Sequence, residues 1–245
     1  MTAKRFYRRG VQNERFASFQ LAVKQTDLWI AVARGSFHPS LPRQVEQEVW
    51  RLRRSLELFL EEHPEMAVTL EPYLLTGPAP DLVLEMVRAG NLVGVGPMAS
   101  VAGAIAERIG RFLMPLSPEV IVENGGDIFI SAVEPVLVGV LGAGSSLARK
   151  LALLIEPRQT PLGVCTSSGK LGPSHSFGLA DAAVALSPSA ALADAAATAL
   201  GNAVRGEEDL EKALELARSI PGLTGALLLC GEKVAAWGDL QLKPL

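Results

Sequence analysis

Apolar and polar positions alternate in blocks that predict short strands and amphipathic helices. Two apolar runs in the segment 16–32 flank a polar break at 24–27, which predicts a hairpin. Across 42–62 the apolar residues recur at steps of three and four, a helical period, and His63-Pro64 ends the predicted helix. The stretch 70–81 carries three prolines and is expected to be a loop that serves as a flap.

Two helices rich in small residues are predicted at 97–110 and 189–204. The first opens at Gly96-Pro97 with Gly110 as its expected stop, and the second opens at Ser187-Pro188, with Gly201 at a matching distance. Apolar runs at 136–141, 150–155, 162–165 and 182–186 predict strands, 207–219 predicts a charged helix, and 225–237 predicts a final hairpin.

The two halves of the chain resemble each other in layout, since each combines strand-rich segments, helices and a glycine-turned hairpin. Strands and helices occur in runs rather than in single alternation, which favours an α+β fold with helices packed on a mostly antiparallel sheet. No change in composition marks a boundary. We therefore expect one domain over 1–245, built from similar halves of approximately 1–134 and 135–245.

Composition excludes several classes of protein. The 245 residues are 49% apolar and 20% charged, and 23 basic residues against 26 acidic ones give a net charge of −3. This balance, with only 5% aromatic residues, argues against a nucleic-acid binder. The sequence shows neither a signal peptide nor a run long enough to span a membrane, so a cytoplasmic protein is expected. Cys165 and Cys230 form no C-x-x-C pair and are expected to be free thiols.

Three segments carry candidate chemistry. In Asn124-Gly125-Gly126-Asp127, two glycines allow positive φ and can present N–H groups to a phosphate or a heterocycle, although an ordinary hairpin turn has the same composition.

A second cluster, Cys165-Thr166-Ser167-Ser168-Gly169-Lys170, follows an apolar run and offers hydroxyls, a thiol and an amine. We expect it to be a strand-end loop with a reactive Cys165, the alternative being a plain serine-rich connection. His175 lies in the same irregular stretch, where a lone histidine more often faces solvent.

Asp194 lies within an alanine-rich helix, four residues before Thr198, so both side chains share one helix face. A carboxylate and a hydroxyl are hard oxygen ligands of the kind that magnesium takes while it bridges to phosphates. The alternative is a solvated aspartate, but its alanine neighbours provide no charged face.

The strings V-E-N-G-G-D, C-T-S-S-G and A-D-A-A-A-T-A-L, in that order, resemble the ApbE superfamily, the flavin transferases that move FMN from FAD onto a protein threonine with magnesium. With V-G-P-M-A-S-V-A-G-A-I-A-E at 95–107, the chain looks closest to an uncharacterised bacterial and archaeal branch. The resemblance implies a duplicated fold of the T-fold type.

By this resemblance, Asp194 and Thr198 match the magnesium-binding pair, the turn 124–127 matches a flavin-side turn, Ser168-Gly169 matches the family's S-G, and His175 matches a family histidine. The chain also departs from the family pattern. Glu123 replaces the Asn of that turn, Lys170 replaces an Asp, and the residues 176–179 after His175 lack the family's Asp, Pro and Thr-Gly. The N-terminal M-G-T-like segment of the family is not visible either.

The residues and the resemblance together favour a protein that binds a flavin nucleotide, FAD or FMN, with magnesium, and FMN transfer is left open. Its partners would be that nucleotide or another phosphorylated small molecule, an acceptor protein and a second copy of the chain, with no nucleic acid and no membrane. The candidate residues are then Asp194, Cys165 and His175 for catalysis, Asp194 and Thr198 for the metal, and the segments 124–127 and 166–169 for the cofactor. Two alternatives are a sulfur-handling, persulfide-type enzyme or carrier that uses Cys165, and a non-catalytic ligand-binding protein.

Overall fold

The computed structural model describes residues 14–140, 150–168 and 178–244. The strands are β1 (Phe16–Val23), β2 (Thr26–Ala33), β3 (Val120–Asn124), β4 (Asp127–Ser131), β5 (Val136–Gly139), β6 (Leu151–Ile155), β7 (Leu162–Ser167), β8 (Ala182–Ser187), β9 (Gly225–Cys230), β10 (Lys233–Gly238) and β11 (Leu242–Pro244). The α-helices are α1 (Leu41–Glu62), α2 (Asp81–Val93), α3 (Val101–Leu113), α4 (Ala190–Ala203) and α5 (Leu210–Ser219).

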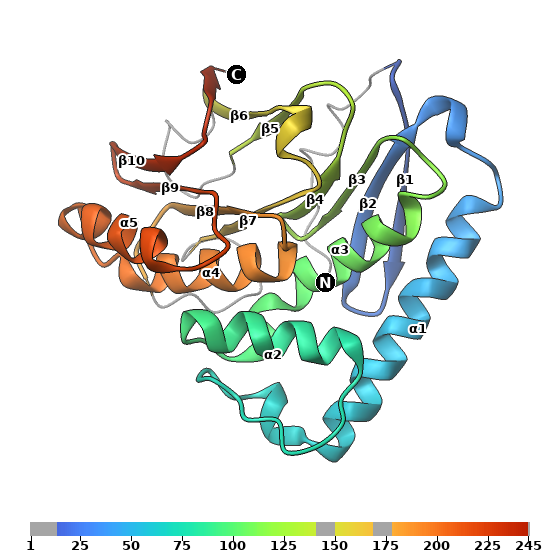
Figure 1. Ribbon diagram of the computed structural model, residues 1–245, viewed down its shortest axis with the longest axis horizontal. Helices are drawn as coiled ribbons and strands as arrows, with labels where there is room; N and C mark the ends of the chain where they lie inside the picture. Colours follow the sequence, from blue (N-terminus) through green and yellow to red (C-terminus); the bar gives the residue numbers. More distant parts are fainter. Residues whose placement is uncertain (1–13, 141–149, 169–177, 245) are drawn as a thin grey trace.

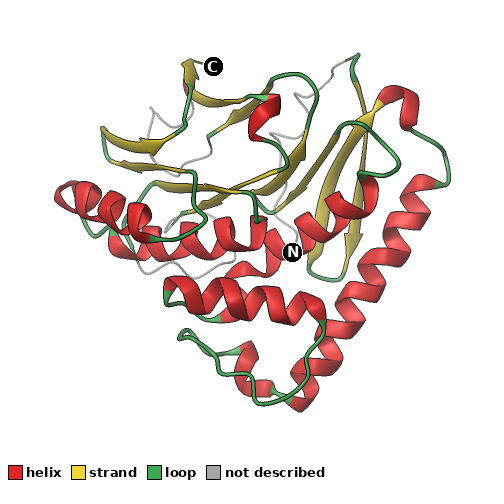
Figure 2. Cartoon of the chain, viewed as in Figure 1, coloured by secondary structure: helices red, strands yellow, loops and turns green. Residues whose placement is uncertain are grey.

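The fold has three layers, with an eight-stranded sheet in the middle (Figures 1 and 2). The helices cover one face of this sheet, and a small sheet of order β11-β6-β5 covers the other. One apolar core lies between the helices and the large sheet, and a second lies between the two sheets. Because all strand pairings in the described residues are antiparallel, the predicted α+β fold with a mostly antiparallel sheet is confirmed.

The large sheet has the order β1-β2-β3-β4-β7-β8-β9-β10. Its first four strands form two hairpins separated by α1, α2 and α3, and its last four form two hairpins separated by α4 and α5. The layout of hairpin, helices and hairpin thus occurs twice. The two helices rich in small residues, α3 and α4, do not occupy equivalent positions in the two halves, however. Helix α3 comes directly before the second hairpin of its half, whereas α4 comes directly after the first hairpin of its half.

This topology places four strand connections at the same end of the sheet, along the edge that is formed by the ends of the strands. Since neighbouring strands run in opposite directions, the turns at 24–25, 125–126 and 231–232 lie at the same edge as the ends of the β7–β8 connection. The β3–β4 turn and the end of β7 are neighbours in the middle of that edge. Two of the segments with candidate chemistry are therefore brought together there.

Helix α1 follows the predicted period, and its apolar stripe from Leu41 to Phe59 is buried. Helix α4 differs, since all its residues from Ala190 to Ala197 are buried. A helix that is apolar on every side belongs in a core, and α4 accordingly contacts β7 and β8 of the sheet and the helices α2, α3 and α5 (Figure 1).

One expectation about local structure is wrong. Gly110 does not end a helix, because α3 continues to Leu113, and a Cβ at this position would lie 2.0 Å from the Phe129 ring. The segment 70–80 is a loop, as predicted, and its role as a flap stays a prediction. The Asn91 side chain of α2 accepts a hydrogen bond from the Tyr73 N–H of this loop at 2.8 Å and donates one to the Tyr73 carbonyl at 2.9 Å.

No single helix in the described parts of the chain is long and apolar enough to cross a membrane. Helix α2 and the segment 97–113 meet the length and composition criteria only as a pair, and they are bent by 105° relative to each other.

Candidate functional site

Asp194 and Thr198 lie one turn apart on α4, as the sequence predicts. Asp194 is buried and Thr198 is half-buried. The Asp194 carboxylate accepts a hydrogen bond from the Gly103 N–H of α3 at 2.8 Å. The α4 aspartate therefore bridges to the beginning of a helix from the other half of the chain.

Two aspartates lie close together at this point. Burial, followed by the negative charge of Asp127, raises the pKa of the Asp194 carboxyl well above its usual range. Hydrogen bonds from the N–H groups of Gly103 and Ala102 act in the opposite direction. No salt bridge joins Asp194 to a basic residue within the described ranges. The two carboxylates thus create negative charge in a buried setting, which a cation would stabilise.

The β3–β4 hairpin supplies the polar residues beside Asp194. Asn124 is buried and donates from Nδ2 to the Ala102 carbonyl at 3.1 Å, and Asp127 begins β4. Since side chains alternate along a strand and Phe129 lies in the helix-side core, Asp127 points to the same face. The side chains of Asn124 and Asp127 therefore both lie on the helix side of the sheet, where α4 packs.

The glycine turn has the predicted backbone, because Gly125 and Gly126 have φ values of 75° and 113°. Its N–H groups are not all presented to a ligand, however. The Glu123 carboxylate accepts the Gly126 N–H at 3.0 Å, and Glu123 is buried. At Gly126, the expected anion-binding N–H is thus used within the hairpin, by the residue that departs from the family pattern.

A Gly126→Ala variant tests the role of this turn. Among the described residues, an added Cβ would meet only the Thr166 carbonyl oxygen, at an ordinary contact distance of 4.0 Å, so the cost comes from positive φ alone. We expect the free energy of unfolding to fall by about 1–3 kcal/mol in urea denaturation. Gly77→Ala, at an open position without positive φ, is the control. If stability falls while FAD binding is unchanged, the turn serves the hairpin only.

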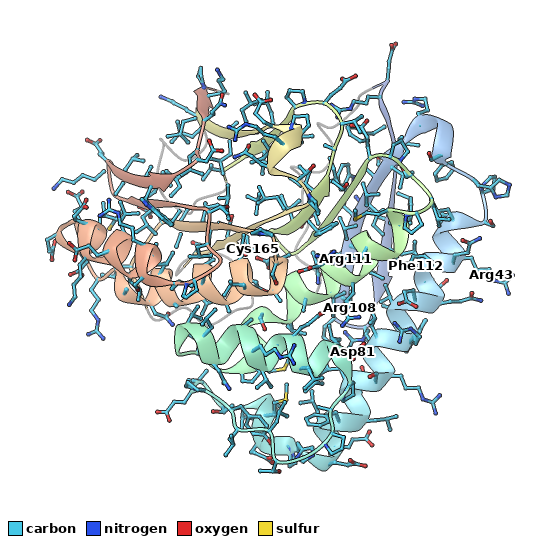
Figure 3. All side chains as sticks on the ribbon, in the orientation of Figure 1. Arg43, Asp81, Arg108, Arg111, Phe112 and Cys165 are labelled. Carbon is cyan, nitrogen blue, oxygen red and sulfur yellow. The ribbon has the colours of Figure 1, made fainter. Side chains whose placement is uncertain are left out.

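Cys165 is not in a strand-end loop, which corrects the sequence analysis. It lies within β7 and is fully buried between the sheet and α4 (Figure 3), where its Sγ donates to the Ala190 carbonyl at 3.4 Å. Burial, followed by the charges of Asp127 and Asp194, raises the pKa of its thiol well above the usual range. A reactive thiol needs access and a lowered pKa, and Cys165 has neither.

The remaining residues of the second cluster divide between the two faces of β7. Thr166 is half-buried and alternates to the side of the small sheet, whereas Ser167 points to the helix side with Cys165. The Ser167 hydroxyl is buried and has no hydrogen-bond partner in the described residues. Ser168 is also buried, and Gly169, Lys170 and His175 lie outside the described residues.

The described residues contain no group of three or more His, Cys, Asp or Glu side chains arranged to hold a metal. A cation at Asp194 would therefore depend on carboxylate, hydroxyl and backbone oxygens together with oxygens of a ligand, the set that magnesium commonly takes.

Glu107, a buried glutamate of α3, is not among the residues predicted from the sequence. Its carboxylate accepts the Ala190 N–H at the start of α4 at 2.7 Å. One feature of the sequence could have indicated its role. Glu107 follows a run of small apolar residues in a helix expected to pack closely, and a glutamate buried in such a helix needs a partner.

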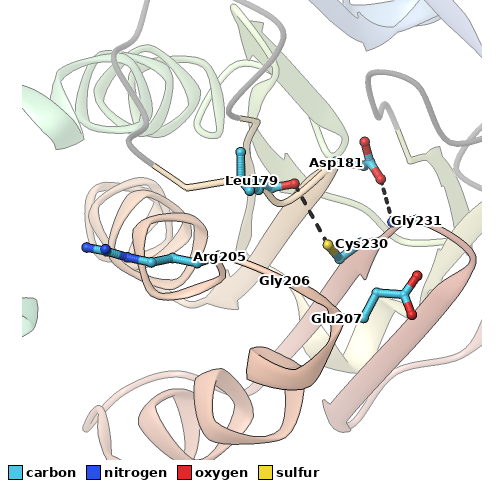
Figure 4. A pocket seen from close by; sticks show the side chains of 7 residues that line it. All are labelled: Leu179, Asp181, Arg205, Gly206, Glu207, Cys230 and Gly231. Carbon is cyan, nitrogen blue, oxygen red and sulfur yellow. Dashed lines mark hydrogen bonds between the residues drawn. The ribbon is translucent and has the colours of Figure 1, made fainter.

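A separate pocket of about 390 Å³ is lined by Leu179, Asp181, Arg205, Gly206, Glu207, Cys230 and Gly231 (Figure 4). Asp181 accepts the Gly231 N–H there at 2.8 Å, and the Cys230 Sγ lies 3.9 Å from the Leu179 carbonyl oxygen. Asp181 is, like Asp194, a carboxylate that the sequence places in alanine-rich surroundings, but none of the residues assigned to catalysis, metal or cofactor lines this pocket.

The sequence suggests Cys165 as the reactive thiol, whereas the structure indicates that Cys230 is the more accessible of the two. Cys230 is 8% exposed and lines a pocket, whereas Cys165 is 0% exposed. In native protein near neutral pH, iodoacetamide should modify Cys230 first, and Cys165 should react only after denaturation. Peptide mass spectrometry of a time course measures this order, and faster labelling of Cys165 would contradict it.

A family model and several related proteins match most of this chain in sequence. The family described as AbpE bacteria matches residues 8–236. A UPF0280 protein of Methanosarcina barkeri is 44% identical over 200 residues, which cover 80% of this chain and 79% of the relative. A UPF0280 protein of Methanocaldococcus jannaschii is 35% identical over 227 residues and covers 90% of both chains.

Solved structures show the same fold. The flavinyl transferase ApbE of Pseudomonas stutzeri, in its apo form, superimposes with a TM-score of 0.61 at 15% identity, covering 91% of this chain and 94% of its own. The flavin transferase ApbE of Vibrio cholerae gives a TM-score of 0.57 at 14% identity, with coverages of 94% and 96%.

Proposed function

This chain belongs to the AbpE bacteria family, and we propose from this membership that it binds a flavin nucleotide, FAD or FMN, together with Mg²⁺. The proposed site lies between α4 and the β3–β4 hairpin. The observation that carries the proposal is the buried pair of carboxylates, Asp194 on α4 and Asp127 on β4, where burial and then the Asp127 charge raise the pKa of the Asp194 carboxyl.

The residues at this site fit magnesium. Asp194 and Thr198 supply a carboxylate and a hydroxyl from one face of α4, and Asp127 adds a second negative charge. A divalent cation would relieve the repulsion between the carboxylates. Hard oxygen ligands and a few waters or phosphate oxygens form its usual coordination shell.

Polar groups near the carboxylates suit a nucleotide. Ser167 has a buried hydroxyl that uses no described partner, and a phosphate oxygen is a suitable acceptor for it. Asn124 is fixed by its bond to α3 and adds an amide to the same face of the sheet. When bound, Mg²⁺ would offset the charge of the nucleotide phosphates. Asp194 and Thr198 would hold it, and Ser167, Ser168 and the turn 124–127 would orient the nucleotide, with Gly169 as a further contact. Thr166, which the sequence also suggested for the cofactor, points to the other face of β7 and is not part of this site.

Transfer of FMN to an acceptor protein is the activity to test once binding is established, because the two fold neighbours are named as flavin or flavinyl transferases. In such a step a protein hydroxyl displaces AMP from FAD and forms a phosphoester with FMN. His175 is the proposed residue for moving the proton of that hydroxyl. The sulfur-handling alternative loses support because Cys165 is buried with a raised thiol pKa. Cytoplasmic location, self-association and the single-domain organisation remain predictions.

The direct test titrates the whole chain with FAD in the presence of Mg²⁺ or of EDTA, and follows quenching of flavin fluorescence. We expect saturable binding that weakens about tenfold or more when the metal is removed. Equal affinity with EDTA would refute the magnesium site, and absence of binding in both buffers would refute the flavin proposal. Release of AMP from FAD would separate transfer chemistry from binding alone.

A further inference from the structure

Helix α3 begins with backbone donors that its own residues do not cap. The N–H groups in the first turn of a helix have no partner inside the helix. Ser100, at the cap position, donates its hydroxyl instead to the carbonyls of Pro97 at 2.8 Å and Met86 at 3.3 Å. The N–H groups of Ala102 and Gly103 are bonded by Asp194, which belongs to α4.

Helix α4 is capped from α3 in the same way. The Glu107 carboxylate accepts the N–H of Ala190, the first residue of α4, at 2.7 Å and the Ser189 hydroxyl at 3.3 Å. Its other oxygen accepts from the Arg111 Nε at 2.8 Å, and Arg111 also belongs to α3 (Figure 3). Each helix therefore holds the positive N-terminal end of the other with a carboxylate.

The two caps share one contact between the helices. Gly103 and Glu107 are one turn apart on α3, and Ala190 and Asp194 are one turn apart on α4. A Cβ on Gly103 would lie 2.3 Å from the Ala190 carbonyl oxygen and 2.8 Å from the Asp194 Cβ. The backbones of α3 and α4 are therefore in direct contact at Gly103. Because Ala190 and Asp194 belong to the same helix, a displacement of α4 at Ala190 must also displace Asp194.

We propose that Glu107 is a positioning residue for the nucleotide and metal site, because its cap on α4 fixes where the Asp194 carboxylate lies relative to Gly103. This inference rests on the proposed function for its consequence in binding. That Glu107 positions Asp194 relative to Gly103 is a statement about the ligand-free protein, and it does not depend on the proposed function. A glutamate suits the role, since one oxygen holds Ala190 while the other is held by Arg111.

The test compares Glu107→Ala and Glu107→Gln with Glu85→Gln. Glu85 also pairs with an arginine of α3, Arg108, at 2.8 Å and 2.9 Å, but it makes no described hydrogen bond to α4. The first measurement is the ¹H–¹⁵N resonance of the Gly103 amide in ligand-free protein, which reports its bond to Asp194. The second is the Mg²⁺-dependent affinity for FAD.

We expect the Ala variant to shift the Gly103 resonance and to weaken Mg²⁺-dependent FAD binding about tenfold or more, with the Gln variant between it and wild type. Glu85→Gln should leave both measurements unchanged. An unshifted Gly103 resonance, or a shifted one with wild-type affinity, would overturn the proposal and leave Glu107 as a helix cap only. If the Ala variant does not fold, the Gln variant decides by the same criteria. If wild-type protein binds no FAD, the proposed function fails, whereas the Gly103 resonance still tests whether Glu107 positions Asp194.

Discussion

A Gly103→Ala variant is expected to lose about 3 kcal/mol of folding free energy or more, the upper part of the range for overpacking a core. The added Cβ would lie 2.3 Å from the Ala190 carbonyl oxygen, a backbone atom that cannot rotate away. The helix propensity of alanine returns only about 1 kcal/mol. For a chain of this size each kcal/mol corresponds to roughly 2–4 °C, so calorimetry should show a Tm lowered by about 6 °C or more.

Gly35→Ala is the matched control, because no heavy atom lies within 4 Å of its added Cβ and its φ is not positive. Its stability should change by no more than about 0.5 kcal/mol, as for other surface substitutions. A Gly103→Ala protein as stable as this control would mean that α3 and α4 can separate without cost. The proposed role of Glu107 would then lose its geometric basis.

Elements with a strong local signal were predictable from the sequence. The hairpin at 16–32 and helix α1 follow from periodicity and from the polar break or proline at their ends. The β3–β4 turn follows from two glycines with positive φ. Helix α4, with Asp194 and Thr198 on one face, follows from its alanine-rich pattern.

Features that depend on packing between distant segments were not predictable in this way. Gly110 suggested a helix end, but it is a close contact with Phe129, and sequence spacing cannot distinguish these uses of glycine. Cys165 suggested an exposed thiol because hydroxyl residues follow it, yet α4 covers the end of β7 and buries it. Helix α2 was not assigned, since the proline-rich loop before it dominated the local signal.

The candidate site shows the same division. The sequence identified Asp194 and Asp127 separately, but their mutual effect arises only when α4 packs against the β3–β4 hairpin. Glu123 and Glu107 were missed as functional groups because each acts on a backbone N–H, at Gly126 and Ala190 respectively. A hydrogen bond from a side chain to a backbone N–H cannot be recognised in a single sequence, because every residue except proline has such an N–H. A glycine turn or a helical period can be recognised.

An Asp194→Asn variant is expected to be more stable than wild type without ligand and much weaker in Mg²⁺-dependent FAD binding. Asparagine keeps the shape and can still accept the Gly103 N–H, but it removes the buried charge beside Asp127. The wild-type carboxyl has a raised pKa in the folded state, so the folded protein binds more protons than the unfolded chain between the two pKa values. Wild-type stability therefore falls as pH rises through that window, and the advantage of the variant should grow from about pH 4 towards neutrality.

Asp181→Asn is the control, because Asp181 is also a buried aspartate that accepts a glycine N–H at 2.8 Å, but at the β9–β10 turn. Thermal unfolding from about pH 4 to about pH 8 and FAD titration with Mg²⁺ should be measured for both variants. We expect only Asp194→Asn to become more stable relative to wild type as pH rises, and only Asp194→Asn to lose FAD affinity, by about tenfold or more. This opposition is typical of a binding site, where a charge that destabilises the ligand-free fold is retained for the ligand. A variant that gains stability but binds FAD as wild type does would show that the Asp194 charge serves no metal.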